Sequence, residues 1–462
     1  VIEEEVKTII PDKNLPDNIR MSLEVSDDKI YYSMDNEVFI YEIDYEIDYE
    51  DSPFGIQAPY SSLGEIPQEK NFLEVNNLIS DIGAKWIRML VPELEKTKEF
   101  SHEFNIIAGI SSPEYPNNMV QHITKTKKIV SLYKDDVQAW MIINEADLNW
   151  KDTDENYAKY VIETSKAIKS VSPDAKIAIS FAGLEGEEHG FSATELLDSA
   201  LENNIGSHFD ILDFHFQGSK GKYKEVLNYV SKYNQILSKH GINKKSLWIT
   251  EYGTYSGDPQ EECSQWWVEG PQSEKEHASE LIKRYIYGIS LNIDKMFWTG
   301  ITEWNKEYQG FGLCSDAYPY KQYFNYVGLI NTPTQADSSS HKKLAYFSYK
   351  FMTEKLEGSD WDNVQTFQEL DNVYIYKFTK NNEPIWVAWW DYFDDTGTSK
   401  TISLDVGNIN SAKITEAVPD AEDGSKIDAN DYPDFFKTET KTVSGGKVEI
   451  TLGESPVFVE GK

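Results

Sequence analysis

The chain contains little cysteine, little arginine and no long apolar segment. Two cysteines among 462 residues exclude a disulfide-rich scaffold and a zinc site built from cysteines. Arginine is found only at Arg20, Arg88 and Arg284, so lysine carries nearly all of the positive charge. No apolar run reaches the roughly 18 residues that a membrane-spanning helix requires. The sequence therefore predicts no membrane span, and it makes an arginine at the end of a strand worth examining.

Positive charge is scarce over the whole chain, which has a formal net charge of −34 at pH 7. A surface of this sign repels nucleic acids, anionic lipids and acidic polymers, so we expect no nucleic-acid partner and a neutral substrate. The sequence begins at Val1 without methionine and without a signal peptide. We therefore expect a mature extracellular or cell-surface form whose leader has been removed, with a cytoplasmic location left open.

Motifs for metals and nucleotides are missing as well. The histidines at 102, 122, 189 and 208 are not placed at metal-ligand spacings, and there is no Gly-x-Gly-x-x-Gly motif. Acidic loops occur, but none follows the twelve-residue pattern of a calcium loop. We expect no metal and no cofactor.

Residues 54–340 alternate short apolar runs with amphipathic stretches. The helical stretches are clearest at Asp154–Val171 and Glu274–Leu291, whereas Val91–Phe104 is barely long enough for a helix and should be irregular. Eight strands separated by helices predict a (β/α)8 TIM barrel, an α/β fold. The predicted strands are Phe54–Ala58, Trp86–Leu90, Asn105–Ile110, Trp140–Asn144, Lys176–Phe181, Phe209–Phe216, Leu247–Glu251 and Lys295–Gly300.

The pattern changes near residue 358. Beyond it, alternating or apolar runs lie between Gly, Asn and Asp turns, which predicts an accessory antiparallel β-sandwich. The segment 20–48 also has strand character. The predicted domains are N-terminal strands packing on the sandwich (1–50), a catalytic barrel (51–358) and the C-terminal sandwich (359–462).

Two of the predicted strands, the fourth and the seventh, deliver a glutamate at the end of an apolar run. These residues are Glu145, which follows Asn144, and Glu251. Active sites of such barrels form where the strands end. Hydrolysis of a glycosidic bond needs one carboxylic acid to protonate the leaving oxygen and one carboxylate to attack the anomeric carbon or to activate water. One such glutamate could equally well cap the next helix, but two at these positions favour a catalytic pair.

This pattern resembles the retaining glycoside hydrolases of clan A, the 4/7 superfamily, over roughly residues 54–358. The resemblance implies that Glu145 is the acid/base, that Glu251 is the nucleophile and that Asn144 binds the sugar 2-hydroxyl. Ala146 stands where many members have proline. The accessory sandwich is similar to that of the β-xylosidase/α-L-iduronidase family, and the cellulase/mannanase family is nearly as close.

The resemblance also implies residues that bind the substrate. Arg88 ends the second strand and would hold Glu251 ionised, while His215 ends the sixth strand. Trp298 on the eighth strand would offer its ring to a sugar. The structural alternatives are a salt bridge, a core histidine and a core tryptophan.

Further binding residues are expected beside and beyond the seventh and eighth strands. Gln217 occupies a position where several families have a tyrosine that bonds the nucleophile, and Tyr252 or Tyr255 is the candidate replacement. Trp304 lies in the long loop 301–340 and completes the expected substrate-binding set. Loops of that length are usually functional.

The two cysteines, Cys263 and Cys314, lie in the predicted loops 253–273 and 301–340. A disulfide between them would tie neighbouring loops together and would favour an oxidising compartment. Two buried free thiols are the slightly favoured alternative.

The sequence as a whole predicts a retaining hydrolase of β-linked glycans or β-glycosides that acts on a neutral oligosaccharide or polysaccharide. A transglycosidase using the same intermediate, and a glycan-binding protein without catalysis, are the alternatives. The sugar, the linkage, endo or exo action and the oligomeric state stay open.

Overall fold

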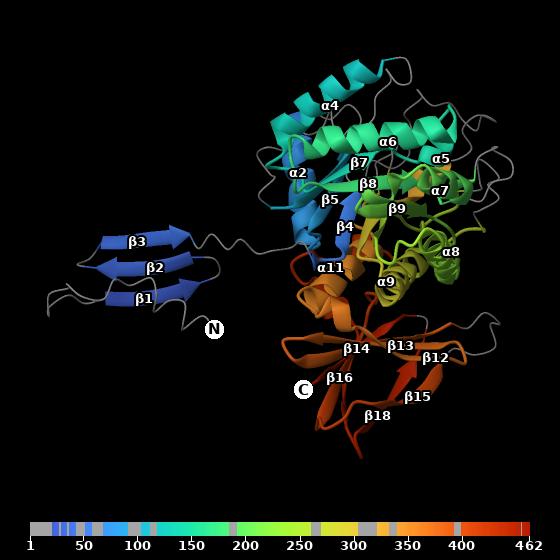
Figure 1. The fold of residues 1–462 in the computed structure, drawn as a ribbon. Helices are drawn as coiled ribbons and strands as arrows, with labels where there is room; N and C mark the ends of the chain where they lie inside the picture. Colours follow the sequence, from blue (N-terminus) through green and yellow to red (C-terminus); the bar gives the residue numbers. More distant parts are fainter. Residues whose placement is uncertain are drawn as a thin grey trace. The chain divides into compact units, whose positions relative to one another are not determined.

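The computed structural model describes the chain in segments that fall into two compact units, Val1–Tyr49 and Glu50–Lys462. In the first unit the strands β1 (Met21–Ser26), β2 (Lys29–Met34) and β3 (Glu37–Glu42) pair antiparallel in that order (Figure 1). Strands are thus present within 20–48 as predicted, and their packing on the sandwich stays a prediction, as do the domain boundaries. The described residues are 21–26, 29–34, 37–42, 51–57, 68–90, 103–110, 118–183, 192–259, 269–303, 321–331, 340–391, 399–453 and 455–462.

The second unit contains a closed barrel of eight parallel strands. They follow one another around the barrel in chain order, and the last pairs with the first. This arrangement confirms the predicted TIM barrel. The strands are β4 (Phe54–Gln57), β5 (Trp86–Leu90), β6 (Asn105–Ile110), β7 (Ala139–Ile142), β8 (Lys176–Phe181), β9 (Ile211–Phe216), β10 (Ser246–Tyr252) and β11 (Lys295–Thr299).

Alternate residues of these strands fill the barrel. Trp86 of β5 and Trp248 of β10 contact each other edge to face, with ring centroids 5.0 Å apart, although two strands separate β5 from β10. Side chains that meet in this way lie inside the barrel, and Phe297 of β11 belongs to the same buried cluster. Their neighbours in sequence, such as Ile87 and Ile249, belong instead to the layer under the helices. This alternation decides which side chains reach the mouth of the barrel.

Helices cover the outside of the barrel (Figure 1). Thr153 caps α6 by accepting from the backbone of Asn156, and Ser273 and Glu276 form a capping box at the start of α9. The irregular crossover expected at 91–104 falls largely outside the described residues. The helices are α2 (Gln68–Asp81), α4 (Met119–Tyr133), α5 (Ala146–Asn149), α6 (Asp154–Lys169), α7 (Ala193–Glu202), α8 (Val226–Lys239), α9 (Glu274–Ser290), α10 (Lys321–Val327) and α11 (Leu344–Leu356). None of these described helices is long and apolar enough to cross a membrane.

The C-terminal part is an antiparallel sandwich, as predicted. A six-stranded sheet faces a two-stranded sheet, and buried residues of both, such as Trp386 and Ile450, form a separate core. The larger sheet has the order β12 (Gln365–Leu370), β13 (Val373–Lys380), β14 (Glu383–Trp390), β19 (Val457–Gly461), β16 (Ser411–Glu416) and β17 (Thr438–Thr442), and the smaller one pairs β15 (Lys400–Asp405) with β18 (Lys447–Leu452).

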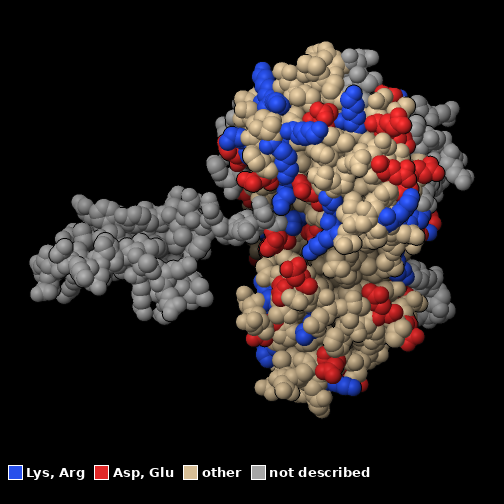
Figure 2. All heavy atoms as spheres, in the orientation of Figure 1, with Lys and Arg blue, Asp and Glu red and all other residues tan. Residues whose placement is uncertain are grey.

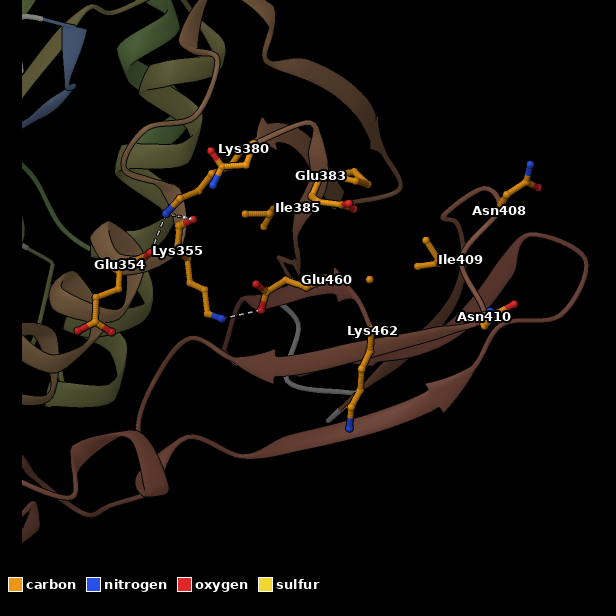
Figure 3. A pocket seen from close by; sticks show the side chains of 13 residues that line it. Glu354, Lys355, Lys380, Glu383, Ile385, Asn408, Ile409, Asn410, Glu460 and Lys462 are labelled. Carbon is orange, nitrogen blue, oxygen red and sulfur yellow. Dashed lines mark hydrogen bonds and ion pairs between the residues drawn. The ribbon is translucent and has the colours of Figure 1, made fainter. Parts of the chain in front are cut away.

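The sandwich joins the barrel at the end where the strands begin. Helix α11 leads into the sandwich, and Glu357 just after it accepts a hydrogen bond from Ser52, which precedes β4. A groove of about 600 Å³ lies here between the end of α11 and the sandwich (Figure 3). The ion pair between Lys355 and Glu460, at 2.7 Å, connects α11 to β19 in this groove. The groove therefore lies away from the strand ends that carry the two glutamates.

Candidate active site

Glu145 follows β7 at a sharp change in backbone direction. It precedes the short helix α5 with φ 50° and ψ 62°, and Ile143 two residues earlier has φ 57°. Left-handed backbone is uncommon outside glycine and is a genuine outlier for a β-branched residue, so this stretch is strained. Between these two residues lies Asn144, whose side chain accepts a hydrogen bond from Arg88. The strained segment thus presents both Asn144 and Glu145 to the mouth of the barrel.

Glu251, near the end of β10, accepts hydrogen bonds through one of its carboxylate oxygens. Its Oε1 accepts from Arg88 Nη1 at 2.6 Å and from Gln57 Nε2 at 3.3 Å. Arg88 Nη2 donates to Asn144, so this one guanidinium links the ends of β7 and β10. The structure therefore brings Arg88, Asn144 and Glu251 together, as the sequence predicted.

His215 lies between the two glutamates. Its Nδ1 is 2.9 Å from Glu145 Oε1 and 3.7 Å from Glu251 Oε2. One oxygen of each carboxylate and this nitrogen all lie within 4.8 Å of one another. The alternative that His215 is only a core histidine does not apply, because its ring contacts the carboxylates of both Glu145 and Glu251.

Opposite charges among Arg88, His215 and the two glutamates stabilise the charged forms of Glu251 and His215. Burial acts to raise the pKa of Glu251, but the positive charges of His215 and Arg88 outweigh it, so that the pKa lies below its ordinary value. Burial acts to lower the pKa of His215, and the nearby Glu251 and Glu145 raise it above its ordinary value. Glu251 is therefore ionised at neutral pH, beside a histidine that favours its charged form.

The same three residues have a spacing that could hold a divalent cation. Carboxylate oxygens and an imidazole nitrogen are ligands that several metals accept. Here, however, Arg88 already bonds Glu251, and His215 favours its protonated form. A metal ion would have to displace Arg88 and the proton of His215, so these contacts disfavour metal binding by the three residues.

Two buried acids near the site escaped the sequence analysis. Asp213 is fully buried inside the barrel, and burial raises its pKa. Asp147 in α5 accepts from the backbone of Ala182 at 2.8 Å, and burial raises its pKa to about 6. A signal for Asp213 was present, because an acid two residues before His215 in an apolar strand shares the inward face of that strand. For Asp147 no comparable signal exists.

Trp298 does not line the site, and its predicted role as a sugar platform is wrong. Its side chain is fully buried in the layer under the helices, where Nε1 donates to the carbonyl of Val327 at 3.0 Å. A platform needs an exposed ring face. The physical reason is alternation: Phe297 faces into the barrel, so Trp298 faces outward.

Tyr252 is likewise wrongly assigned to substrate binding. It is fully buried, and its hydroxyl donates to the carbonyl of Arg284 in α9 at 2.9 Å. Tyr255 is buried too, with its hydroxyl bonded to the carbonyl of Gly270. Tyr252 and Tyr255 thus bond backbone carbonyls and neither Glu145 nor Glu251, and Gln217 donates to Thr299 at 2.7 Å.

Two predicted features rest on residues outside those that the structure describes. They are the substrate-binding role of Trp304 and the pairing of Cys263 with Cys314. Each stays a prediction.

Comparison with known proteins shows the fold. No protein-family model and no curated protein sequence matches the chain. Among solved structures, an α-L-arabinofuranosidase from Thermotoga maritima is similar with a TM-score of 0.57 at 9% identity, covering 88% of this chain and 92% of that one. A family 30 subfamily 8 xylanase from Clostridium acetobutylicum has a TM-score of 0.52 at 12% identity, covering 89% and 96%. A family 51 α-L-arabinofuranosidase from Bifidobacterium longum has a TM-score of 0.55 at 9% identity, covering 84% and 89%. At these identities the similarity establishes a shared architecture.

Proposed function

We propose that this chain is a retaining glycoside hydrolase in which Glu145 is the acid/base and Glu251 the nucleophile. The observation that carries the proposal is the approach of their carboxylate oxygens to within 4.8 Å at the ends of β7 and β10. Retaining enzymes separate these groups by about 5–5.5 Å, whereas inverting enzymes leave about 6.5–9.5 Å for a water molecule. The spacing here suits direct attack on the sugar.

In the first step Glu251 attacks the anomeric carbon. Its Oε1 is engaged by Arg88 and Gln57, so Oε2 is the oxygen available to form the bond. The glycosidic bond breaks at the same time, and the proton of Glu145 passes to the leaving oxygen. A covalent glycosyl ester on Glu251 and an ionised Glu145 result.

In the second step Glu145 acts as a base. It takes a proton from water, the water oxygen bonds to the anomeric carbon, and the ester bond to Glu251 breaks. His215, 2.9 Å from Glu145 Oε1, stabilises the negative charge that Glu145 carries between the steps. Both glutamates then return to their starting protonation states.

Asn144 is the expected contact to the substrate. Its Oδ1 accepts from Arg88, which fixes the amide and leaves Nδ2 to donate to a sugar hydroxyl. An arabinofuranosidase and a xylanase share the architecture, which supports a glycan as the substrate class. We propose a neutral, β-linked glycan or β-glycoside.

The test is the stereochemistry of the first product. Aryl β-glucosides, β-xylosides and α-L-arabinofuranosides, together with β-glucan, xylan and mannan, would be screened, and the best substrate followed by proton NMR from the first turnover. We expect the first-formed anomer to keep the configuration of the substrate. Net inversion would overturn the retaining mechanism, and absence of hydrolysis throughout would overturn the proposed activity.

A further inference from the structure

Strand β10 contains one residue more than its neighbours just before Glu251. Against β9, Trp248 pairs with Asp213 and Glu251 pairs with His215, so three steps along β10 match two along β9. Against β11 the same excess is found, because Ile249 pairs with Met296 and Tyr252 with Trp298. An extra residue in one strand is a β-bulge. Thr250 is the residue that lies within the excess on both sides.

This bulge decides where Glu251 points. Trp248 faces into the barrel and Ile249 faces the helices. Strict alternation would continue with Thr250 inward and Glu251 outward, because side chains change face at every residue. In the structure Glu251 instead meets Arg88 and His215 inside the barrel, and Tyr252 faces the helices. Without the bulge, the carboxylate would face the helix layer.

Side chains from other strands satisfy the backbone of the bulge. Asp213 Oδ1 accepts from the backbone N–H of Thr250 at 2.8 Å, and its Oδ2 accepts from the Thr250 hydroxyl at 2.9 Å. Arg88 Nη1 donates to the Thr250 carbonyl at 3.3 Å. A bulged residue loses its ladder partners, and a buried backbone group without a partner is costly. Asp213, itself fully buried, supplies the hydrogen-bond acceptor for the Thr250 N–H that the neighbouring strand no longer provides.

We propose that Asp213 is a positioning residue that closes the β10 bulge and thereby turns Glu251 into the mouth of the barrel. Its effect on turnover rests on the proposed glycosidase function, whereas its effect on the direction of Glu251 does not. Asp213 has a second contact through which it could affect turnover. Its Oδ2 lies 3.6 Å from His215 Nε2, so its negative charge could act on the charge of that ring and not on the bulge.

Two substitutions separate these routes. Asp213→Asn keeps an oxygen that can accept from the Thr250 N–H and lets the amide nitrogen donate to the Thr250 hydroxyl, but it removes the charge. Asp213→Ala removes both hydrogen bonds. We expect kcat to fall by about 100-fold in Asp213→Ala with KM changed by no more than about threefold, because a small misplacement of the reacting group has that effect. Asp213→Asn should keep kcat within about threefold of the parent.

The matched control is Asp81→Ala. Asp81 is also a carboxylate with several hydrogen-bond donors, among them Lys350 and Tyr346, but it lies on α2 in the helix layer. Its loss should lower thermal stability and leave kcat unchanged. A fall in kcat for Asp81→Ala equal to that for Asp213→Ala would assign both effects to general destabilisation and overturn the proposal.

A crystal structure of Asp213→Ala provides a readout that does not depend on activity. We expect the contact between Glu251 and Arg88 to be broken in it, and Asp213→Asn to retain the parental 2.6 Å pair. If Glu251 keeps its place in Asp213→Ala, or if Asp213→Asn loses activity as fully as Asp213→Ala, the proposal is wrong. If Asp213→Ala does not fold, Asp213→Asn decides by the same two readouts. A parent enzyme without glycosidase activity would refute the proposed function alone, since the direction of Glu251 is still tested by the structures.

Discussion

Glu251 and Glu145 differ in their surroundings, although both are strand-end carboxylates. Arg88 and Gln57 bond Glu251, whose side chain is 12% exposed, while that of Glu145 is 26% exposed and contacts His215. Arg88, which is always charged, bonds the group that in the proposed mechanism carries negative charge before the reaction. The more exposed carboxylate, Glu145, is the group that in the proposed mechanism exchanges protons with the leaving oxygen and with water.

Substitution of Glu145 should affect substrates unequally. Glu145→Ala should lower kcat/KM by about 10²–10⁴ for glycosides with poor leaving groups, because these need protonation as the bond breaks. Activated aryl glycosides, which need little protonation, should lose much less in their first step. Steady-state kinetics over a series of leaving-group pKa values measures this. Equal losses across the series would contradict the role of Glu145 as the acid.

Substitution of Arg88 should change the pH profile. Its positive charge helps to keep the pKa of Glu251 below the ordinary value, so Arg88→Ala should raise that pKa. The acidic limb of kcat/KM must then move to higher pH, and turnover must fall. A pH–rate profile recorded beside a thermal unfolding curve checks both. A variant that unfolds well below the parent temperature yet keeps its specific activity and its profile would make Arg88 structural.

At the scale of elements, helix α5 contains a buried carboxylate, Asp147, whose ionised form is destabilised by burial. Burial raises the pKa of Asp147 from 3.8 to about 6, so the native state binds a proton that the unfolded chain has released. As the pH rises from about 4 to about 6, the native state therefore loses stability relative to the unfolded chain.

Asp147→Asn should consequently stabilise the protein at neutral pH. The two pKa values predict a gain of about 3 kcal/mol at pH 7.5 that disappears below about pH 4, where the parent carboxyl is protonated as well. The amide oxygen can still accept from Ala182. Urea unfolding of both proteins at the two pH values measures the difference. The same difference at both values would show that ionisation of Asp147 is not its cause.

The strands were predictable because their apolar runs differ clearly from the polar helices between them. The run from Leu247 to Tyr252 shows the limit. Its apolar residues indicate a strand but not which face each side chain takes, and the bulge at Thr250 changes the face partway along. The sequence therefore placed Glu251 near the end of its strand, where the structure has it, but also assigned Tyr252 and Trp298, which face the helices, to the site. The spacing of Asp213 to His215 indicates that both face into the barrel, but its contact with Thr250 depends on the pairing of β9 with β10, which the sequence does not reveal.

At the scale of the whole molecule, a buried charge cluster joins the barrel to the sandwich. Asp391 after β14 pairs with Lys283 of α9 at 3.0 Å and accepts from the hydroxyl of Tyr223 in the 3-10 helix Tyr223–Glu225. On the face seen in Figure 2, by contrast, acidic and basic side chains are interspersed over both parts. An exposed ion pair contributes little to stability, whereas removing one partner of a buried pair is costly, so we expect the buried cluster to contribute more to the stability of the joint between barrel and sandwich.

Asp391→Ala should test the joint between the two parts. It leaves Lys283 buried without this partner, which should lower the free energy of unfolding by roughly 3–5 kcal/mol. The control is Glu439→Ala, which breaks the exposed pair with Lys441 and should cost about 0–1 kcal/mol. Urea unfolding measures both variants. Equal and small losses would mean that the cluster does not hold the sandwich to the barrel.

The central claim is that Glu251 forms a bond to the sugar, and covalent trapping tests it most directly. The parent protein would be incubated with an activated 2-deoxy-2-fluoro glycoside of the sugar that it hydrolyses fastest, and the labelled peptide identified by mass spectrometry. We expect one fluoroglycosyl group per chain, on Glu251, and none in Glu251→Ala. A label on another residue, or hydrolysis of the parent substrate by Glu251→Ala at the parental rate, would contradict the account.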